Sequence, residues 1–303
     1  MSNSQFYSPG KLLISGEYLV LDGGLALAVP TRFGQSMTVT KRAEAGIRWI
    51  SLDHEGNTWF STDFKESDFK ESSNDPLQNR LNQLFDIISE LQPSLFAENQ
   101  GYEIRSQLEF PRQWGLGSSS TLIANLANWA DIDPYTLLER SFGGSGYDVA
   151  VAQADAAIIY QKTQNGARVD PVDLNWPFED QLYFIYLNKK QDSREAIARY
   201  RAQSEKSRVI DRVNEITLEM VNCTNLDHFE ELMVAHEAII GGQIGLKPVQ
   251  QSLFADYPGK VKSLGGWGGD FVIATGDQRT RDYFKSKGFN TILPFKDLIK
   301  KAP

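Results

Sequence analysis

The hydrophobic positions of this chain follow two periods, and together they predict a mixture of strands and helices. Alternating or β-branched runs predict strands, whereas apolar residues three or four positions apart predict helices. Strands are expected at 11–21, 25–29, 36–41, 46–52, 102–110, 156–161, 182–187, 271–274 and 291–293. Helices are expected at 77–91, 121–130, 134–140, 194–221 with a break near Ser204, 227–240 and 279–287. Because strands and helices are mixed and hairpins are present, the pattern favours an α+β fold over a doubly wound α/β fold.

Turn-forming residues indicate where the pattern is interrupted. A turn at 22–24 separates the first two strands, and Pro30 is expected to end the second strand. The polar stretch 62–74 is expected to be an exposed connection. A run rich in turn formers at 165–180 is the best candidate for a domain boundary. A length of 303 residues favours two domains, which we place at 1–179 and 180–303.

Composition and charge exclude several classes of protein. With 41% hydrophobic and 23% charged residues, the chain is an ordinary globular one. Its net charge of −8 argues against a nucleic-acid partner, although local backbone N–H groups can still hold a phosphate. The single cysteine, Cys223, excludes an internal disulfide and a thiolate-rich zinc site, and it favours a reducing compartment. No leader and no membrane-spanning run is visible, so a cytoplasmic location without membrane contact is expected.

The glycine-serine stretch 115–120 is the first that points to chemistry, because it runs directly into an expected helix. Glycines allow a ligand to approach the backbone, and a helix N-terminus offers unpaired N–H groups to an anion. The serine hydroxyls can contact phosphate oxygens or Mg²⁺. A tight turn followed by a helix cap explains the stretch equally well. It is neither a Walker loop nor a dinucleotide fingerprint, because no Gly-Lys-Ser/Thr and no third glycine follows.

Three further stretches carry candidate residues, each with an ordinary alternative. Lys262 precedes four glycines around Trp267, which suits a loop beside a phosphate or a merely flexible loop. Lys11 follows Pro-Gly, and it is either a solvated residue at a strand edge or a cation that neutralises transferred charge. Asp148 follows the glycine cluster 143–146, and it is either a helix cap or the carboxylate that orients a phosphoryl acceptor.

In their order along the chain, these stretches resemble the motifs of the GHMP kinases, the superfamily of galactokinase, homoserine, mevalonate and phosphomevalonate kinases. The first motif is Pro-Gly-Lys with a following Gly-Glu, here 9–18; the second is Gly-Leu-Gly-Ser-Ser, here 115–119; the third is the glycine loop 262–270. Gly16-Glu17-Tyr18, the segment 144–150 and Gly-Gly-Asp at 268–270 resemble phosphomevalonate kinase in particular. Two residues depart from that pattern: Gln113 stands where a lysine is common, and Trp267 replaces a small residue.

The resemblance implies a fold and an activity. The fold would be α+β, with a ribosomal-protein-like N-terminal domain that binds ATP and a ferredoxin-like C-terminal domain. The activity would be ATP- and Mg²⁺-dependent phosphorylation of a small molecule, with phosphomevalonate as acceptor. Mevalonate is the alternative acceptor, and a nucleotide-binding homologue without turnover is a further alternative. The oligomeric state is left open, with a homodimer as one option.

The resemblance also implies roles for individual residues. Asp148 and Lys11 would be the catalytic pair. The nucleotide phosphates would lie against Gly115, Leu116, Gly117, Ser118, Ser119 and Ser120. The acceptor side and the third loop would be formed by Glu17, Ser145, Gly146, Lys262, Gly265, Gly266, Gly268, Gly269 and Asp270. Ser119 would contact Mg²⁺, and Glu139 is a second metal candidate whose spacing does not match the family.

Two polar features remain outside these motifs. His236 lies on the apolar side of an expected helix, so a core or capping histidine is expected rather than a ligand. The charged run 189–212 is expected to be a solvated helical face. Alternatively, it is a mobile segment that carries Lys189, Lys190 and Arg194 to an anionic substrate.

Overall fold

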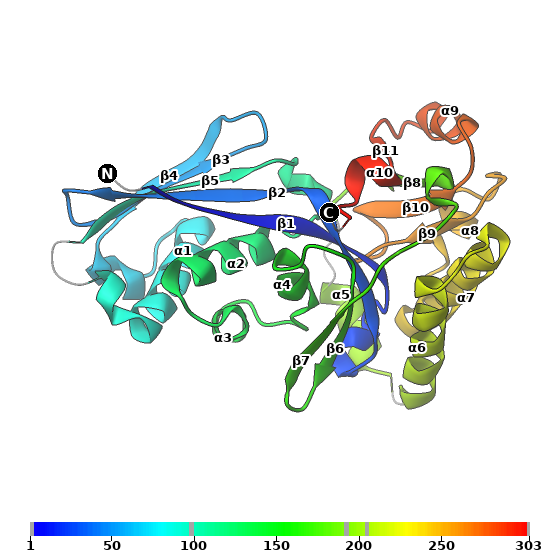
Figure 1. Ribbon diagram of the computed structural model, residues 1–303, viewed down its shortest axis with the longest axis horizontal. Coiled ribbons are helices and arrows are strands. Elements are labelled where there is room, and N and C mark those ends of the chain that lie inside the picture. Colours follow the sequence, from blue (N-terminus) through cyan, green and yellow to red (C-terminus); the bar gives the residue numbers. More distant parts are fainter. Residues whose placement is uncertain (1–2, 97–99, 191–193, 204–205, 302–303) are drawn as a thin grey trace. The chain divides into compact units, whose positions relative to one another are not determined.

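The computed structural model describes residues 3–96, 100–190, 194–203 and 206–301. Figure 1 shows the arrangement of its elements. The strands are β1 (Asn3–Ser15), β2 (Ala26–Arg42), β3 (Gly46–Leu52), β4 (Thr58–Phe64), β5 (Gly101–Leu108), β6 (Ile158–Thr163), β7 (Gly166–Pro171), β8 (Leu182–Tyr186), β9 (Val261–Ser263), β10 (Phe271–Thr275) and β11 (Ile292–Pro294). The α-helices are α1 (Pro76–Leu91), α2 (Ser118–Ala130), α3 (Pro134–Arg140), α4 (Tyr147–Ala152), α5 (Arg194–Arg201), α6 (Ser207–Val221), α7 (Leu226–Ile244), α8 (Val249–Leu253), α9 (Arg279–Ser286) and α10 (Phe295–Leu298).

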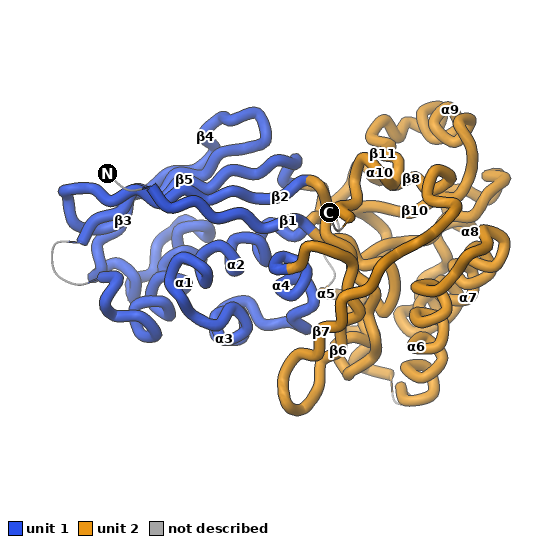
Figure 2. The backbone as a smooth tube through the Cα atoms, in the orientation of Figure 1, with its two compact units in different colours: residues 1–10, 33–112, 117–153 blue, residues 11–32, 113–116, 154–303 orange. Residues whose placement is uncertain are grey.

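The chain forms two compact units, which Figure 2 distinguishes by colour. Unit 1 comprises residues 1–10, 33–112 and 117–153, and unit 2 comprises residues 11–32, 113–116 and 154–303. The expected division at residue 180 does not coincide with these units. Strands β1 and β2 each contribute to both units, so the first 32 residues cannot be assigned to one contiguous N-terminal block.

Unit 1 is a sheet with helices on one face. Its strands follow the order β4-β3-β5-β2, with β1 paired to β2. Strand β3 runs parallel to β5, whereas the β3–β4 and β2–β5 pairs are antiparallel. Figure 1 shows α1 to α4 on the same side of this sheet. The inward residues of the sheet, such as Trp49 and Ile104, pack against Phe85 of α1 and Ile123 of α2 to form the core. Burial of these large apolar side chains stabilises the layered arrangement.

Unit 2 contains a second, four-stranded sheet with the order β11-β8-β10-β9, in which every pair is antiparallel. The start of β2 pairs with β6, and β6 forms a hairpin with β7. Helix α7 packs against α6 and β9. This helix starts at an N-cap, where the Asn225 side chain accepts a hydrogen bond from the backbone N–H of His228, and it ends at Gly245 in the left-handed conformation.

The expected α+β class is confirmed, since helices and a mixed sheet occur together. Most expected elements are present within a few residues of their predicted bounds, including α1, α3 and α7. The break in the charged helical run separates α5 from α6, although Ser204 itself lies outside the described residues. The structure adds strands β4 and β7, which had not been expected: β4 reaches into the expected connection 62–74, and β7 lies in the run 165–180 that was the candidate domain boundary.

The expectation that Pro30 ends a strand is wrong, because β2 continues from Ala26 to Arg42. Pro30 falls between the segment that pairs with β6, residues 26–28, and the segment that pairs with β5, residues 35–42. A proline lacks the N–H that a sheet ladder needs, and at this place neither of those ladders requires one.

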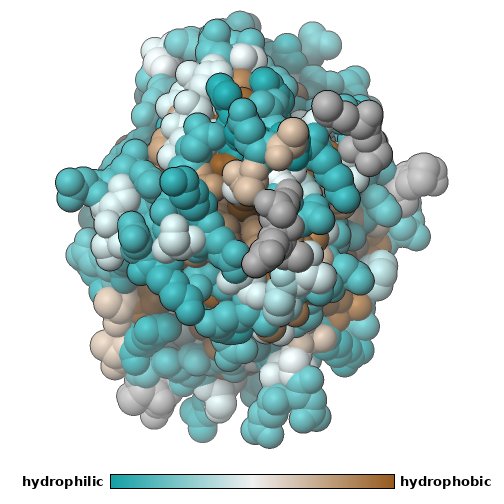
Figure 3. Space-filling model, turned by 90° about the vertical axis from the view of Figure 1, so that its left-hand side faces the viewer, coloured by the Kyte–Doolittle hydropathy of each residue, from teal (hydrophilic) through white to brown (hydrophobic). Residues whose placement is uncertain are grey.

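The face drawn in Figure 3 is covered mainly by hydrophilic residues, with hydrophobic residues visible between them. Among the described residues, no helix has both the length and the apolar character that a membrane span requires.

Candidate functional site

Three of the sequence motifs meet inside unit 2. The backbone N–H of Lys11, in β1, donates to the carbonyl oxygen of Leu116 at 2.9 Å. The carboxylate of Asp270, at the end of the third glycine loop, lies directly against Gly115: a Cβ added to Gly115 would come 2.5 to 2.7 Å from its carboxyl atoms. Residues more than a hundred positions apart therefore form one contact group.

The second motif continues into unit 1 as the start of α2. Gly117 precedes the helix in a left-handed conformation with φ 88°, and no side chain from the described residues caps the first turn. The N–H groups of the first turn are therefore left for another acceptor, which is the arrangement that binds anions at helix N-termini. The unpaired backbone N–H groups at the start of α2 are therefore suited to bind a nucleotide phosphate.

The three serines of this turn differ in exposure. Ser119 is exposed and Ser118 is half-buried, so both hydroxyls are accessible to a ligand. Ser120 is buried, and its hydroxyl donates to the carbonyl oxygen of Gly117 at 2.8 Å. Leu116 is also buried, and its carbonyl oxygen is occupied by Lys11. Within the predicted nucleotide-binding set, Ser120 and Leu116 therefore shape the loop from the inside.

Asp148 lies in the first turn of α4, which packs against α2 within unit 1. Gly146 precedes this helix with φ 90°, so two helices that begin after left-handed glycines are neighbours. Asp148 is half-buried, and its Oδ1 accepts a hydrogen bond from the backbone N–H of Val149 at 3.1 Å. Its charge also reaches α3: burial first, and then Asp133 and Asp148, raise the pKa of Tyr135 to about 12.

The third glycine loop is ordered by Trp267. This residue has a left-handed backbone, and its side chain is only 2% exposed. It packs in an apolar cluster with Tyr18, Tyr200 and Ile240, and its ring lies against Gly241 of α7. Among the loop glycines, Gly268 is exposed, Gly265 and Gly266 are half-buried, and Gly269 is buried. The tryptophan that departs from the family pattern therefore fastens the loop to the helix.

Glu17 and Lys262, predicted on the acceptor side, form a buried ion pair instead of facing solvent. Their exposed fractions are 1% and 0%, and Lys262 Nζ donates to Glu17 Oε1 at 2.8 Å. Burial opposes ionisation of Glu17, but Lys262 and His236 outweigh it, so the pKa of the Glu17 carboxyl is lowered. Gly16 shows why a glycine stands at this turn, since an added Cβ would lie 2.2 Å from the carbonyl oxygen of Leu25.

The donor set for Mg²⁺ is small. Ser119 offers an exposed hydroxyl, and Glu139 is exposed on α3. Among the described residues, no group of three or more His, Cys, Asp or Glu side chains is placed to hold a metal ion. A magnesium ion at this loop would therefore take most of its oxygens from nucleotide phosphates and water, with Ser119 as the protein contact.

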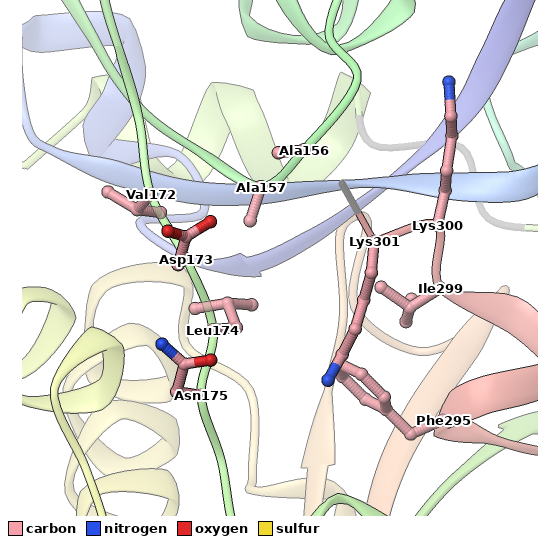
Figure 4. A pocket seen from close by; sticks show the side chains of 10 residues that line it. All are labelled: Ala156, Ala157, Val172, Asp173, Leu174, Asn175, Phe295, Ile299, Lys300 and Lys301. Carbon is pink, nitrogen blue, oxygen red and sulfur yellow. The ribbon is translucent and has the colours of Figure 1, made fainter. Parts of the chain in front are cut away.

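A separate pocket of about 140 Å³ lies elsewhere in unit 2 and is drawn in Figure 4. Its lining includes Asp173, Phe295, Lys300 and Lys301, and none of the predicted site residues. Both lysines are paired with carboxylates, Lys300 with Asp155 at 2.8 Å and Lys301 with Glu179. This pocket therefore offers no unpaired lysine and is not the candidate site.

Comparison with known proteins identifies the fold of this chain. Neither a family model nor a curated protein matches the sequence. Among solved structures, Methanococcus jannaschii mevalonate kinase superposes with a TM-score of 0.70 at 14% identity, covering 100% of this chain and 99% of that one. Lactococcus lactis galactokinase complexed with galactose gives 0.73 at 15% identity, covering 99% and 94%. The chain has the GHMP kinase fold.

A further structure of the GHMP kinase fold carries two ligands. Streptococcus pneumoniae phosphomevalonate kinase in complex with phosphomevalonate and AMPPNP gives a TM-score of 0.69 at 16% identity, covering 94% of this chain and 95% of that one. At these identities the likeness establishes the fold, and the fold is that of kinases from the superfamily whose motifs the sequence resembles.

Two site-supporting residues were missed by sequence reasoning. Glu237 was not singled out, although its Oε1 accepts a hydrogen bond from the backbone N–H of Ser263. Ser15, whose hydroxyl is 2.9 Å from that of Thr217, was also passed over. A charged residue beside an apolar helix stripe was the only available signal for Glu237, and its partner lies 26 positions away.

Proposed function

We propose that this protein is an ATP-dependent kinase of a small molecule, with phosphomevalonate as the acceptor. The observation that carries the proposal is the contact group in unit 2, where Lys11 bonds to Leu116 and Asp270 lies against Gly115. A lysine, a helix N-terminus with unpaired N–H groups and a second glycine loop suit phosphoryl transfer, because the reaction depends on alignment and charge neutralisation.

Each group of residues would have its own role in the reaction. Backbone N–H groups at the start of α2, with the hydroxyls of Ser118 and Ser119, would hold the phosphates of ATP. Lys11 would neutralise charge on the transferring phosphoryl group. An acceptor oxygen attacks the terminal phosphorus of ATP, the bond to the bridging oxygen breaks, and ADP leaves. Magnesium, when bound, supplies further neutralisation of the phosphates.

The part played by Asp148 depends on the acceptor. A phosphate acceptor is already ionised at neutral pH, so Asp148 would orient the acceptor or a neighbouring cation. An alcohol such as mevalonate must lose its proton, and Asp148 would then accept it.

Mevalonate is kept as the second acceptor because of the residues ahead of the loop. Gln113 stands where phosphomevalonate kinases often have a lysine, and the neighbouring cation, Arg112, lies over the ring of Trp59 at 3.5 Å. An arginine engaged with an aromatic ring is a weaker substitute for a lysine that binds a phosphate. The same proposal includes a cytoplasmic location and a small-molecule acceptor as partner, with a homodimer as an option.

The test is ADP release with Mg²⁺, ATP and one acceptor at a time. Phosphomevalonate is expected to support the fastest turnover. Turnover with mevalonate alone would establish the alternative acceptor, and turnover with galactose or homoserine would move the substrate outside this pathway. ATP binding without ADP release for all four acceptors would identify a nucleotide-binding homologue without kinase activity.

Asp148→Asn is the matching variant. We expect turnover to fall by at least about 100-fold while ATP affinity stays the same, because the side chain keeps its shape and loses its charge. Asp155→Asn is the control, since Asp155 is an exposed carboxylate that pairs with Lys300. Equal turnover in Asp148→Asn and wild type would remove Asp148 from catalysis.

A further inference from the structure

Four titratable side chains are enclosed together in unit 2. Glu17, His236, Glu237 and Lys262 have exposed fractions of 1%, 0%, 2% and 0%. They come from the turn after β1, from helix α7 and from strand β9. Enclosing so many ionisable groups is costly unless they satisfy one another, so the cluster calls for an account of what it holds in place.

One side of the cluster holds the turn that follows β1. The backbone N–H of Gly16 donates to Nε2 of His236 at 3.1 Å, and Glu17 accepts a hydrogen bond from Lys262 at 2.8 Å. The Oε2 of Glu17 also lies 3.2 Å from Nε2 of His236, so the helix and the strand fix this turn through the Gly16 backbone and through the Glu17 side chain.

The other side of the cluster holds the third glycine loop. The backbone N–H of Ser263 donates to Glu237 Oε1, and Lys262 Nζ donates to the carbonyl oxygen of Ser263 at 2.8 Å. Further along the loop, Trp267 rests on Gly241, one helical turn beyond Glu237. Helix α7 therefore contacts the loop both where it begins and at its tryptophan.

We propose that His236, Glu237 and Lys262 act as a buried latch that positions the two motifs on which the site depends. The latch joins the Gly16–Tyr18 turn to the loop 264–270, and so keeps Lys11 and Asp270 beside the 115–116 loop. None of its three members is a catalytic residue, because each is enclosed. The effect on turnover rests on the proposed function, whereas the ordering of the loop does not.

The net charge of the buried cluster depends on whether the carboxyl of Glu237 is protonated. Lys262 and Glu17 cancel each other in charge. Burial and the nearby Lys262 lower the pKa of His236, which fits a neutral ring that accepts from Gly16. Burial raises the pKa of Glu237 to about 7 against the opposing effect of Lys262. With Glu237 ionised, the charged groups that face it, Lys262 from β9 and Glu17 from the turn, leave one negative charge without compensation.

One atom of the latch makes its state depend on a proton. Oε2 of Glu237 is buried and has no hydrogen-bond partner within the ranges that the structure describes. Ionised Oε2 would be a buried charge without a donor, which is unfavourable. The latch is therefore expected to loosen as the pH rises through 7.

Amide hydrogen exchange of residues 263–270 tests this latch without any acceptor. In the wild type, protection corrected for the intrinsic pH dependence of exchange should fall by roughly tenfold or more between pH 6 and pH 8.5. In Glu237→Gln it should stay constant, because the amide keeps an oxygen for Ser263 and cannot ionise. The control is Glu231→Gln on the same helix, whose side chain is 79% exposed, and it should behave as the wild type does.

The outcomes are distinguishable. A wild-type loop whose protection does not change with pH, or changes equally in Glu237→Gln, would overturn the latch. Lys262→Met leaves the buried Glu17 carboxylate without its cation and should lower the exchange protection of residues 263–270. If that variant does not fold, the double variant Glu17→Gln/Lys262→Met removes both charges and should still lower the protection. Unchanged protection in the double variant would also overturn the proposal.

With an active acceptor, kcat of the wild type should fall over the same pH range and kcat of Glu237→Gln should not, with the KM for ATP unchanged in both. Total absence of kinase activity would refute the proposed function and leave the exchange result to stand alone.

Discussion

Two glycines with nearly the same backbone differ in what a methyl group would meet. Gly115 has φ 69° and Gly143 has φ 64°, so alanine at either position takes on similar left-handed strain of about 1 kcal/mol. At Gly115 the new Cβ would also meet the carboxylate of Asp270, whereas at Gly143 nothing lies within 4 Å. We expect Gly115→Ala to lower the free energy of unfolding by about 1 kcal/mol more than Gly143→Ala does.

Chemical denaturation measures this difference, and an ATP titration of both variants extends it to the site. Gly115→Ala should weaken ATP binding because Asp270 must move, while Gly143→Ala should bind as the wild type does. Equal losses of stability in the two variants would mean that Asp270 does not fill the space above the loop.

At the scale of an element, helix α7 carries adjacent glycines that face different surroundings. A Cβ on Gly241 would lie 2.6 Å from the carbonyl oxygen of Leu246 and 3.4 Å from the ring of Trp267. A Cβ on Gly242 would meet nothing within 4 Å. Gly241→Ala should therefore destabilise the protein by about 1–3 kcal/mol, and Gly242→Ala should stabilise it by up to about 1 kcal/mol, since alanine favours a helix.

Thermal unfolding of the two alanine variants, measured in parallel, tests whether the melting temperature falls in Gly241→Ala and rises in Gly242→Ala. Exchange of residues 264–270 should accelerate only in Gly241→Ala, because only that substitution clashes with the Leu246 carbonyl oxygen and so disturbs the part of α7 that the Trp267 ring contacts. A stabilised Gly241→Ala would show that the Leu246 carbonyl oxygen does not crowd this position of α7.

Elements were predictable where their signals are local. An N-cap aspartate followed by proline starts both α1 and α3, and each helix forms where that pattern stands. The hairpin strands β4 and β7 were missed because both are mainly half-buried or exposed, so the period of their hydrophobic residues is weak. The continuation of β2 past Pro30 could not be predicted, since it depends on which neighbours pair with each part of the strand.

At the scale of the whole molecule, Glu237 links folding to pH. Its pKa is about 7 in the folded chain and 4.5 ordinarily, so between these values the folded chain keeps a proton that the unfolded chain has released. Its contribution to stability is complete below pH 4.5 and is lost as the pH rises through 7. Between pH 4.5 and pH 8, Glu237→Gln should gain about 3 kcal/mol in unfolding free energy relative to the wild type.

Urea denaturation at several pH values measures this gain, with Glu231→Gln as the exposed reference. Other groups titrate in the same range, so the comparison between variants isolates the one carboxyl. A constant difference between wild type and Glu237→Gln across pH would show that the pKa of Glu237 is the same in the folded and the unfolded chain.

Much of the candidate site followed from the sequence, because its signals are residue types at fixed short spacings. Lys11 after Pro-Gly, the Gly115–Ser119 loop and Asp270 after paired glycines could all be recognised without coordinates, and three of these stretches do meet in unit 2. The enclosed state of Glu17 and Lys262 could not be foreseen, because a lysine beside a glycine loop looks the same whether it faces a ligand or a carboxylate 245 positions away.

The sequence by itself determined the helices with local caps, the α+β class and the order of the motifs, since these depend on neighbours within a few positions. Tertiary structure alone decided how the chain divides into units, that Trp267 is enclosed against α7, and that an acid and a base from opposite ends of the chain neutralise each other. The physical reason is range: hydrogen-bonding and conformational preferences act along the chain, whereas burial and charge compensation depend on residues that only folding brings together.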